Sequence, residues 1–240
     1  GISGIPNYVS PPSYFIPQAF HQSFNGKYIG RFGKKATSID LLQQVVIAFK
    51  EDIGVTSFYD SGEPAINGLA SPYPDNVPDP EVSTNTILNI VFYLRTLKAP
   101  IQRNQDDEEV IAGAQLFNDL KCAKCHIPEW TTEQSDIAAL SNKTFYPYTD
   151  LLLHNMGNTL DDGYTEGSAQ TYEWRTPPLW GLGLAKNSQG GQYYLMHDGR
   201  ATSISQAILF HGGEAFNSKE SFLGLSDSDK QKLLKFLESL

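Results

Sequence analysis

The chain has 240 residues, with 18 lysines and arginines against 27 aspartates and glutamates, and a net charge of −9 at pH 7. This acidic balance argues against a nucleic-acid or anionic-lipid surface, because such surfaces depend on clustered basic side chains. No apolar run approaches the roughly 18 residues of a membrane span, so no membrane-spanning segment is expected. The 20 glycines and 14 prolines indicate an irregular, loop-rich globular chain.

The first predicted helices lie in two segments that resemble later parts of the chain. Residues 36–49, "ATSIDLLQQVVIAF", begin with the same four residues as residues 201–213, "ATSISQAILFHGG". Residues 84–97, "TNTILNIVFYLRTL", end with the same leucine spacing as the last helical segment of the chain. Because the two matches occur in the same order, they predict an internal duplication.

A further helix is predicted over residues 107–120, "DEEVIAGAQLFNDL", which carry an uneven apolar stripe. The acidic residues 106–109 suit the N-terminal end of a helix, where the helix dipole favours negative charge. The helix delivers Cys122 and Cys125, the only cysteines of the chain, at its C-terminal end.

The stretch "KCAKCHIPEW" places His126 directly after the two cysteines. A zinc site would need about four nitrogen or sulfur ligands, and the sequence has no second cluster to provide them. A thioredoxin-like pair would need a βαβ context, whereas a helix precedes this pair. In Cys-x-x-Cys-His, two thioethers hold the haem vinyl groups and the histidine binds the iron from the proximal side. The motif therefore predicts one covalently attached haem c.

The second axial ligand of such a haem is usually a histidine or a methionine. In residues 201–213, Ile204, Ala207, Ile208 and His211 recur at helical spacing, so His211 ends an apolar stripe. A hydrogen-bonded core histidine explains the same pattern, and both interpretations stay open on spacing alone. The other candidates are His21, His154, His197, Met156 and Met196, with the methionines favoured as packing residues.

The last helix is predicted over residues 225–240, capped by Ser226 or Ser228. Together these elements predict a mainly α, cytochrome c-like fold with long irregular loops. Residues 1–104 are expected to form the back half of a first cytochrome c-like domain plus a linker, and residues 105–240 a complete c-type haem domain.

Three segments carry a resemblance to a known family. "TFYPYTDLLLHNMG", "EWRTPPLWGLGL" and "YYLMHDGRATSISQAILFHGGEA" follow one another in the order found in the C-terminal part of the di-haem oxidoreductases. These are relatives of the bacterial di-haem cytochrome c peroxidases. In the peroxidases a ligand follows the "HDG" histidine by about one short helix, so the resemblance implies that His211 binds the haem iron opposite His126.

The resemblance also implies roles for three side chains near the haem edge. His197 and Arg200, in "HDGR", would hydrogen-bond a propionate, and Arg175, in "EWRTPPLW", invites the same interpretation. A contact that only stabilises a loop is the alternative for each of them.

In the peroxidases a glutamine and a carboxylate stand over the peroxide-binding haem. The resemblance assigns these catalytic roles to Gln44 and Asp52, with Glu51 as a neighbour. Residues 43–46, near the expected repeat of His211, offer no strong iron ligand, so a haem facing this helix would keep an open position. A polar helix face followed by a solvated "KED" run explains the same residues without catalysis.

The first domain has no Cys-x-x-Cys-His of its own within the 240 residues. We therefore expect a second haem on an N-terminal half or a separate chain, and a peroxidase-like enzyme that draws electrons from a redox partner protein. A mono-haem electron carrier is the alternative function. Covalent haem attachment suggests a periplasmic or other extracytoplasmic location.

The related peroxidases bind calcium between their domains, so Ca²⁺ is considered as a further ligand. The proline-rich segment 71–81 contains Asp75, Asp79 and Glu81, which are oxygen ligands in principle. An exposed acidic loop is the commoner explanation, and no calcium site is assigned.

Overall fold

The structure is a computed structural model that describes residues 2–63 and 77–240. Its contacts divide the chain into two compact units. The C-terminal unit contains residues 2–6 and 98–240, and the N-terminal unit contains the described residues between 7 and 97. Within the described ranges, no helix is both long enough and apolar enough to cross a membrane.

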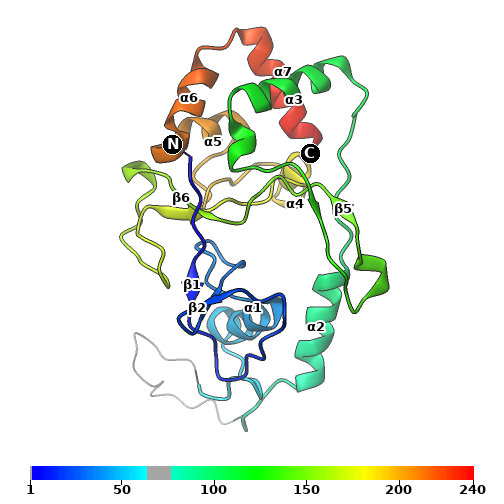
Figure 1. Cartoon of the computed structure of the whole chain (residues 1–240), viewed down its shortest axis with the longest axis vertical. Coiled ribbons are helices and arrows are strands. Elements are labelled where there is room, and N and C mark those ends of the chain that lie inside the picture. The colour runs from blue at the N-terminus through cyan, green and yellow to red at the C-terminus, as the bar shows by residue number, and fades with distance from the viewer. Residues whose placement is uncertain (1, 64–76) are drawn as a thin grey trace. The chain divides into compact units, whose positions relative to one another are not determined.

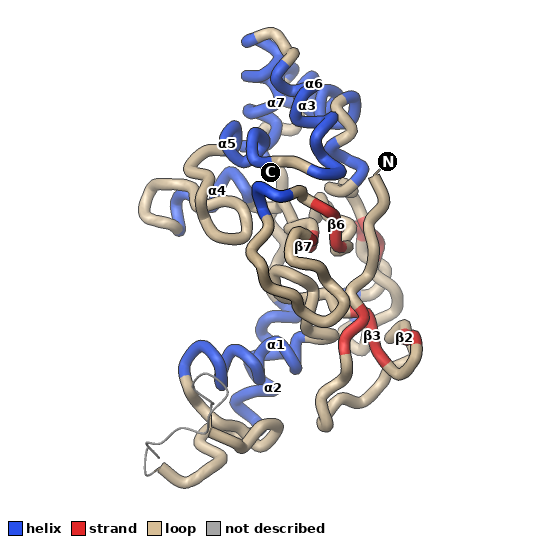
Figure 2. Tube along the Cα trace, turned by 90° about the vertical axis from the view of Figure 1, so that its left-hand side faces the viewer, coloured by secondary structure: helices blue, strands red, loops and turns tan. Residues whose placement is uncertain are grey.

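The N-terminal unit combines a small antiparallel sheet with two helices (Figure 2). Its strand order is β1-β3-β2, with β1 at Tyr8–Val9, β2 at Ser23–Phe24 and β3 at Lys27–Ile29. Helix α1 (Leu41–Ile47) continues into a π-helical turn (Ala48–Asp52), and α2 (Thr84–Thr96) packs against α1.

The core of the N-terminal unit lies between α1 and α2. Val45, Val46 and Ile87 are buried there. Asp40 caps α1 by accepting a hydrogen bond from the backbone of Gln43, and Ser83 caps α2 in the same way. These side chains satisfy backbone N–H groups that the first helical turn leaves without a partner.

The C-terminal unit is built around α3 and α7, which lie side by side (Figure 1). Asp107 caps α3, and Ser226, one of the two predicted serines, caps α7. Gly113 permits the close approach, because a Cβ there would collide with the backbone of Lys232 and with Phe236. The helices of this unit are α3 (Glu108–Asp119), α4 (Leu182–Ser188), α5 (Ile204–Phe210), α6 (Phe216–Leu223) and α7 (Asp227–Ser239).

Two short antiparallel strand pairs complete the C-terminal unit. Strand β4 (Trp130–Thr131) pairs with β5 (Thr144–Phe145). Strand β6 (Leu153–Asn155) pairs with β7 (Glu173–Arg175), which places His154 opposite Trp174.

The prediction of a mainly α fold is wrong. Beside helices α1–α7, the described residues form one three-stranded sheet and two two-stranded sheets, so the fold is mixed α/β. The strands have only two or three residues each. A strand this short shows almost no alternation of apolar and polar residues, which is the pattern that identifies a strand in a sequence.

The two units contain helices of matching length. Helices α1 and α5 have seven residues each, but α1 continues through Ala48 into the π-helical turn, whereas α5 ends at His211, which has an extended backbone. Helices α2 and α7 have 13 residues each and begin at a serine cap. The matching lengths and N-terminal caps allow the segments of the predicted repeat to be compared position by position.

Candidate haem-binding site

The cysteine pair lies in a tight turn at the end of α3. Lys121 takes a left-handed backbone conformation with φ of 68°, and a 3₁₀ turn follows at Cys122–Lys124. The backbone N–H of His126 then donates to the carbonyl of Cys122, at 3.0 Å. Both thiols are free, and burial raises the pKa of the Cys122 thiol to about 11. The turn therefore presents two cysteines and the following histidine as one compact group.

His126 is held by a backbone carbonyl. Its Nδ1 lies 3.0 Å from the carbonyl oxygen of Tyr148. Burial, and after it the electrostatic effect of His211, lower the pKa of His126 to about 4. The ring is therefore neutral at pH 7, with the Nδ1 proton donated to the carbonyl, and this arrangement leaves Nε2 to bind a metal.

His211 repeats this arrangement at the end of α5. Its Nδ1 lies 2.7 Å from the carbonyl oxygen of Ala207, one helical turn earlier. Burial also lowers the pKa of His211, so this imidazole is neutral as well. His211 also acts electrostatically on His126 and lowers its pKa.

These residues fit a haem. Neither His126 nor His211 has a hydrogen-bond partner at Nε2 among the described residues. Two neutral imidazoles with free Nε2 atoms suit the two axial positions of an iron, and the adjacent free thiols suit attachment to vinyl groups.

A third histidine, His154, belongs to β6 and lies beside Cys125. It is only 2% exposed. Its Nε2 is 2.8 Å from Oδ2 of Asp150, and its Nδ1 is 3.1 Å from Oε2 of Glu214. The same Nδ1 is 3.6 Å from Sγ of Cys125. By sequence alone His154 is only one ligand candidate among several, because its carboxylate partner Glu214 is 60 residues away.

The profile of one protein family matches residues 1–240, and the family is described as "Di-haem oxidoreductase, putative peroxidase". The chain belongs to this family. The predicted family resemblance is thereby confirmed, and the match includes the first hundred residues as well as the motif-rich second half. Haem is the cofactor that the family implies. Comparison with curated proteins and with solved structures found no match.

In this di-haem oxidoreductase, the predicted propionate contacts are occupied by other partners. The ring of His197 stacks on Trp174, with centroids 3.6 Å apart. Arg200 donates to Asp198 and, at 2.7 Å, to the carbonyl of Thr159. These contacts hold the loop around "HDGR", and a propionate role for His197 and Arg200 stays a prediction.

Arg175 is half-buried on β7 and its Nη1 lies 3.5 Å from the carbonyl oxygen of Thr176. Burial lowers the pKa of its guanidinium group, although the group stays charged at neutral pH. A hydrogen bond from Arg175 to a haem propionate likewise stays a prediction.

The predicted catalytic residues all lie along α1 and its extension. Gln44 is half-buried in α1, whereas Glu51 and Asp52 are exposed in the π-helical turn. The buried amide belongs instead to the neighbouring Gln43, whose Oε1 accepts the backbone N–H of Ile39 at 2.8 Å. Gln43, and not Gln44, therefore binds the backbone at the start of α1.

The helix caps shift the expected register of the repeat by two residues. Matching "ATSI" letter by letter pairs His211 with Val46, but matching the helix caps pairs it with Ala48. Neither side chain can bind iron. The absence of a histidine or methionine at this point of α1 is thus independent of the alignment.

The acidic residues considered for calcium have protein partners. Asp75 lies outside the described residues. Asp79 and Glu81 both accept hydrogen bonds from Thr56. Across residues 2–63 and 77–240, no group of three or more His, Cys, Asp or Glu side chains is arranged to hold a metal ion.

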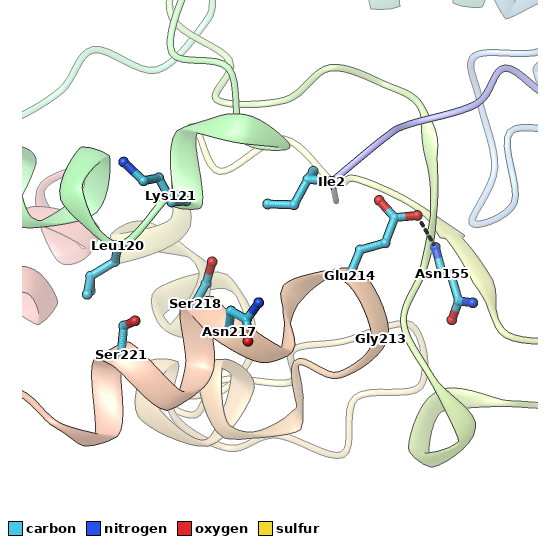
Figure 3. Close-up of a pocket in the computed structure, with 9 residues that line it drawn as sticks. All are labelled: Ile2, Leu120, Lys121, Asn155, Gly213, Glu214, Asn217, Ser218 and Ser221. Carbon is cyan, nitrogen blue, oxygen red and sulfur yellow. Dashed lines mark hydrogen bonds between the residues drawn. The ribbon is translucent and has the colours of Figure 1, made fainter.

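A hollow of about 410 Å³ lies in the C-terminal unit next to the anchor (Figure 3). Lys121 on its wall directly precedes Cys122, and Gly213 and Glu214 follow His211 closely. The segments that flank both candidate ligands therefore meet at this hollow. The other lining residues are Ile2, Leu120, Asn155, Asn217, Ser218 and Ser221.

Proposed function

We propose that this chain is the electron-transfer part of a di-haem peroxidase, with one haem c attached to Cys122 and Cys125. The observation that carries the proposal is the matched pair of neutral histidines, each with Nδ1 on a backbone carbonyl and Nε2 free. His126 and His211 would each hold the iron through Nε2. Bound there, haem c supplies a one-electron redox centre.

Two imidazole ligands determine what kind of chemistry this centre performs. With both imidazoles bound to it, the iron would have no position left for peroxide, so His126 and His211 would hold a haem that relays electrons and does not bind the substrate. The half-buried rings are held by carbonyl oxygens at 3.0 and 2.7 Å. Fixed ligands favour fast electron transfer, because little has to move when the iron changes its charge.

We place the peroxide-binding haem on an N-terminal half or a partner chain that packs on α2. When the serine caps of α2 and α7 are matched, Tyr93 and Leu97 correspond to Phe236 and Leu240. Phe236 and Leu240 are each 2% exposed, in the core that α7 shares with α3. Tyr93, by contrast, is 62% exposed and Leu97 is 52% exposed. The exposed apolar face supports a missing counterpart of α3, which would carry a second Cys-x-x-Cys-His.

At that second haem, α1 would provide the catalytic side chains. By the N-terminal caps Ala48 is the counterpart of His211, and an alanine there would give the iron no protein ligand. Gln44 and Asp52 lie four residues before and four residues after Ala48, and Glu51 adjoins Asp52. The amide of Gln44 would orient peroxide, and the carboxylate of Asp52 would move a proton between its oxygens.

The proposed donor is a redox partner protein in the periplasm or another extracytoplasmic compartment. The net charge of −9 favours a basic or neutral partner. The compartment follows from covalent attachment of haem to free thiols, which bacteria carry out outside the cytoplasm.

A mono-haem electron carrier is the second candidate. The observation in its favour is the single Cys-x-x-Cys-His in 240 residues. An electron carrier would need no haem with a free iron coordination position, whereas a peroxidase needs one to bind peroxide.

The deciding experiment is intact mass measurement with haem staining of native material. We expect one covalent haem on this stretch and a second on an N-terminal half or a partner chain. Replacing Cys122 and Cys125 with serine should remove only the haem attached to this stretch. The haem that remains is then the one on the N-terminal half or partner chain. A native assembly with a single haem would contradict the peroxidase and leave the electron carrier.

A further inference from the structure

His154 is a buried histidine that takes no part in the proposed electron transfer. It lies in the centre of β6, and its ring nitrogens meet two carboxylates from different parts of the chain. Asp150 precedes β6 by three residues, and Glu214 belongs to the 3₁₀ turn Gly213–Ala215 that follows His211.

The ring of His154 carries a positive charge at neutral pH. Burial alone would lower its pKa, but hydrogen bonds with Asp150, Cys125 and Glu214 raise the pKa of His154 to about 11. The pKa values of both carboxyl groups are held below their ordinary values, in part by the same hydrogen bonds. A buried cation between two anions is rigid, because displacing any partner leaves an uncompensated charge in the interior.

One end of this cluster touches the proximal side of the haem site. Asp150 lies two residues beyond Tyr148, whose carbonyl oxygen orients His126. Sγ of Cys125, the residue that precedes His126, is 3.6 Å from the imidazole of His154. His154 therefore contacts the anchor segment both directly and through Asp150.

The other end holds the segment that carries the distal ligand. Glu214 accepts the backbone N–H of Asn155 at 3.2 Å (Figure 3). It also accepts the backbone N–H of Ser3 at 2.8 Å. The turn is packed tightly as well, since a Cβ on Gly213 would collide with the backbone of Asn155. The position of the turn after His211 is thus set by β6 and by the contact between Glu214 and the imidazole of His154.

We propose that His154 is a positioning residue that fixes the separation of the two axial histidines by tying the Cys125–His126 segment to the turn behind His211. The inference rests on the proposed haem site. It assigns no iron contact to His154 itself. Groups that orient metal ligands from behind commonly change metal binding by about 10- to 100-fold when they are removed.

The test compares the haem-loaded protein with the variants His154→Gln and Glu214→Gln. Glutamine keeps a hydrogen-bonding side chain of similar length but removes the charge of His154. The matched control is His21→Gln, which alters a histidine of the N-terminal unit that accepts the backbone N–H of Gln18. Spin state, from absorption and electron paramagnetic resonance spectra, is the readout, together with covalent haem content and unfolding temperature.

We expect His154→Gln and Glu214→Gln to lower the ratio of six-coordinate to five-coordinate haem by about tenfold or more at unchanged covalent haem content. His21→Gln should leave the ratio unchanged. Should His154→Gln fail to fold, Glu214→Gln decides, because it retains the Asp150–His154 ion pair.

A wild-type ratio in both haem-loaded variants would overturn the inference, even if their unfolding temperatures fell, because the cluster would then only stabilise the fold. A wild-type protein without covalent haem would instead contradict the proposed function. The two failures are therefore distinguishable.

Discussion

His126 and His211 are held by the same kind of hydrogen bond, although one follows a cysteine turn and the other ends a helix. In each case Nδ1 donates to a backbone carbonyl, that of Tyr148 or that of Ala207. A backbone carbonyl selects one tautomer and fixes the ring without adding charge. Both histidines therefore present a neutral Nε2, the form that binds iron.

Replacing His211 with alanine should convert a low-spin haem to a high-spin haem, because the iron loses its distal ligand. His211→Met is the matched variant, since a thioether can still bind iron, and it should remain low-spin with a higher reduction potential. Absorption spectra and redox titration measure both effects. An unchanged low-spin spectrum in His211→Ala would remove His211 from the site.

At the scale of elements, the crossing of α3 and α7 brings the cysteine turn into position. Phe117 near the end of α3 packs on Phe236 of α7, with ring centroids 5.4 Å apart. Lys235 of α7 bonds Asp107 and Glu109 at the start of α3. The crossing is close only because Gly113 has no side chain.

Gly113→Ala should lower the free energy of unfolding by about 1–3 kcal/mol, since the added methyl group overpacks the helix crossing. Gly224→Ala is the control, because a Cβ there would lie at an ordinary 3.6 Å from its nearest neighbour. Urea denaturation of both variants gives the comparison. Equal free energies of unfolding for the two variants would show that α3 and α7 can move apart without loss of stability.

At the scale of the whole molecule, each unit has a hydrophobic core of its own. The core of the C-terminal unit includes Leu233, Phe236 and Leu237, and that of the N-terminal unit centres on Ile87. All three tryptophans, at positions 130, 174 and 180, belong to the C-terminal unit. Tryptophan fluorescence therefore reports on this unit alone.

Ile87→Ala should destabilise the N-terminal unit by about 2–5 kcal/mol, because it leaves a cavity at a fully buried position. We expect the transition followed by circular dichroism to shift or divide, while the transition followed by tryptophan fluorescence stays in place. Leu233→Ala is the matched variant and should move the fluorescence transition. Coincident shifts of both signals in Ile87→Ala would mean that the units unfold together.

The residues with local signals could be read from the sequence. Cys122, Cys125 and His126 form a contiguous motif, and the caps Ser83 and Ser226 directly precede periodic apolar runs. Such signals depend on spacings of a few residues, which the sequence displays directly. Family membership followed from motifs of the same kind.

Other features depended on contacts between distant residues. The strands are too short to show alternation, and the counterpart of His211 is Val46 by matching letters but Ala48 by matching the N-terminal caps of α1 and α5. The ion-paired state of His154 requires Glu214, 60 residues away, and the orientation of His126 requires the carbonyl of Tyr148. The sequence by itself determined the Cys-x-x-Cys-His motif, the helices α1, α2, α3, α5 and α7, and the family, because these follow from neighbouring residues. Only the tertiary structure decided which groups face each histidine, because burial and long-range hydrogen bonds set both charge and orientation.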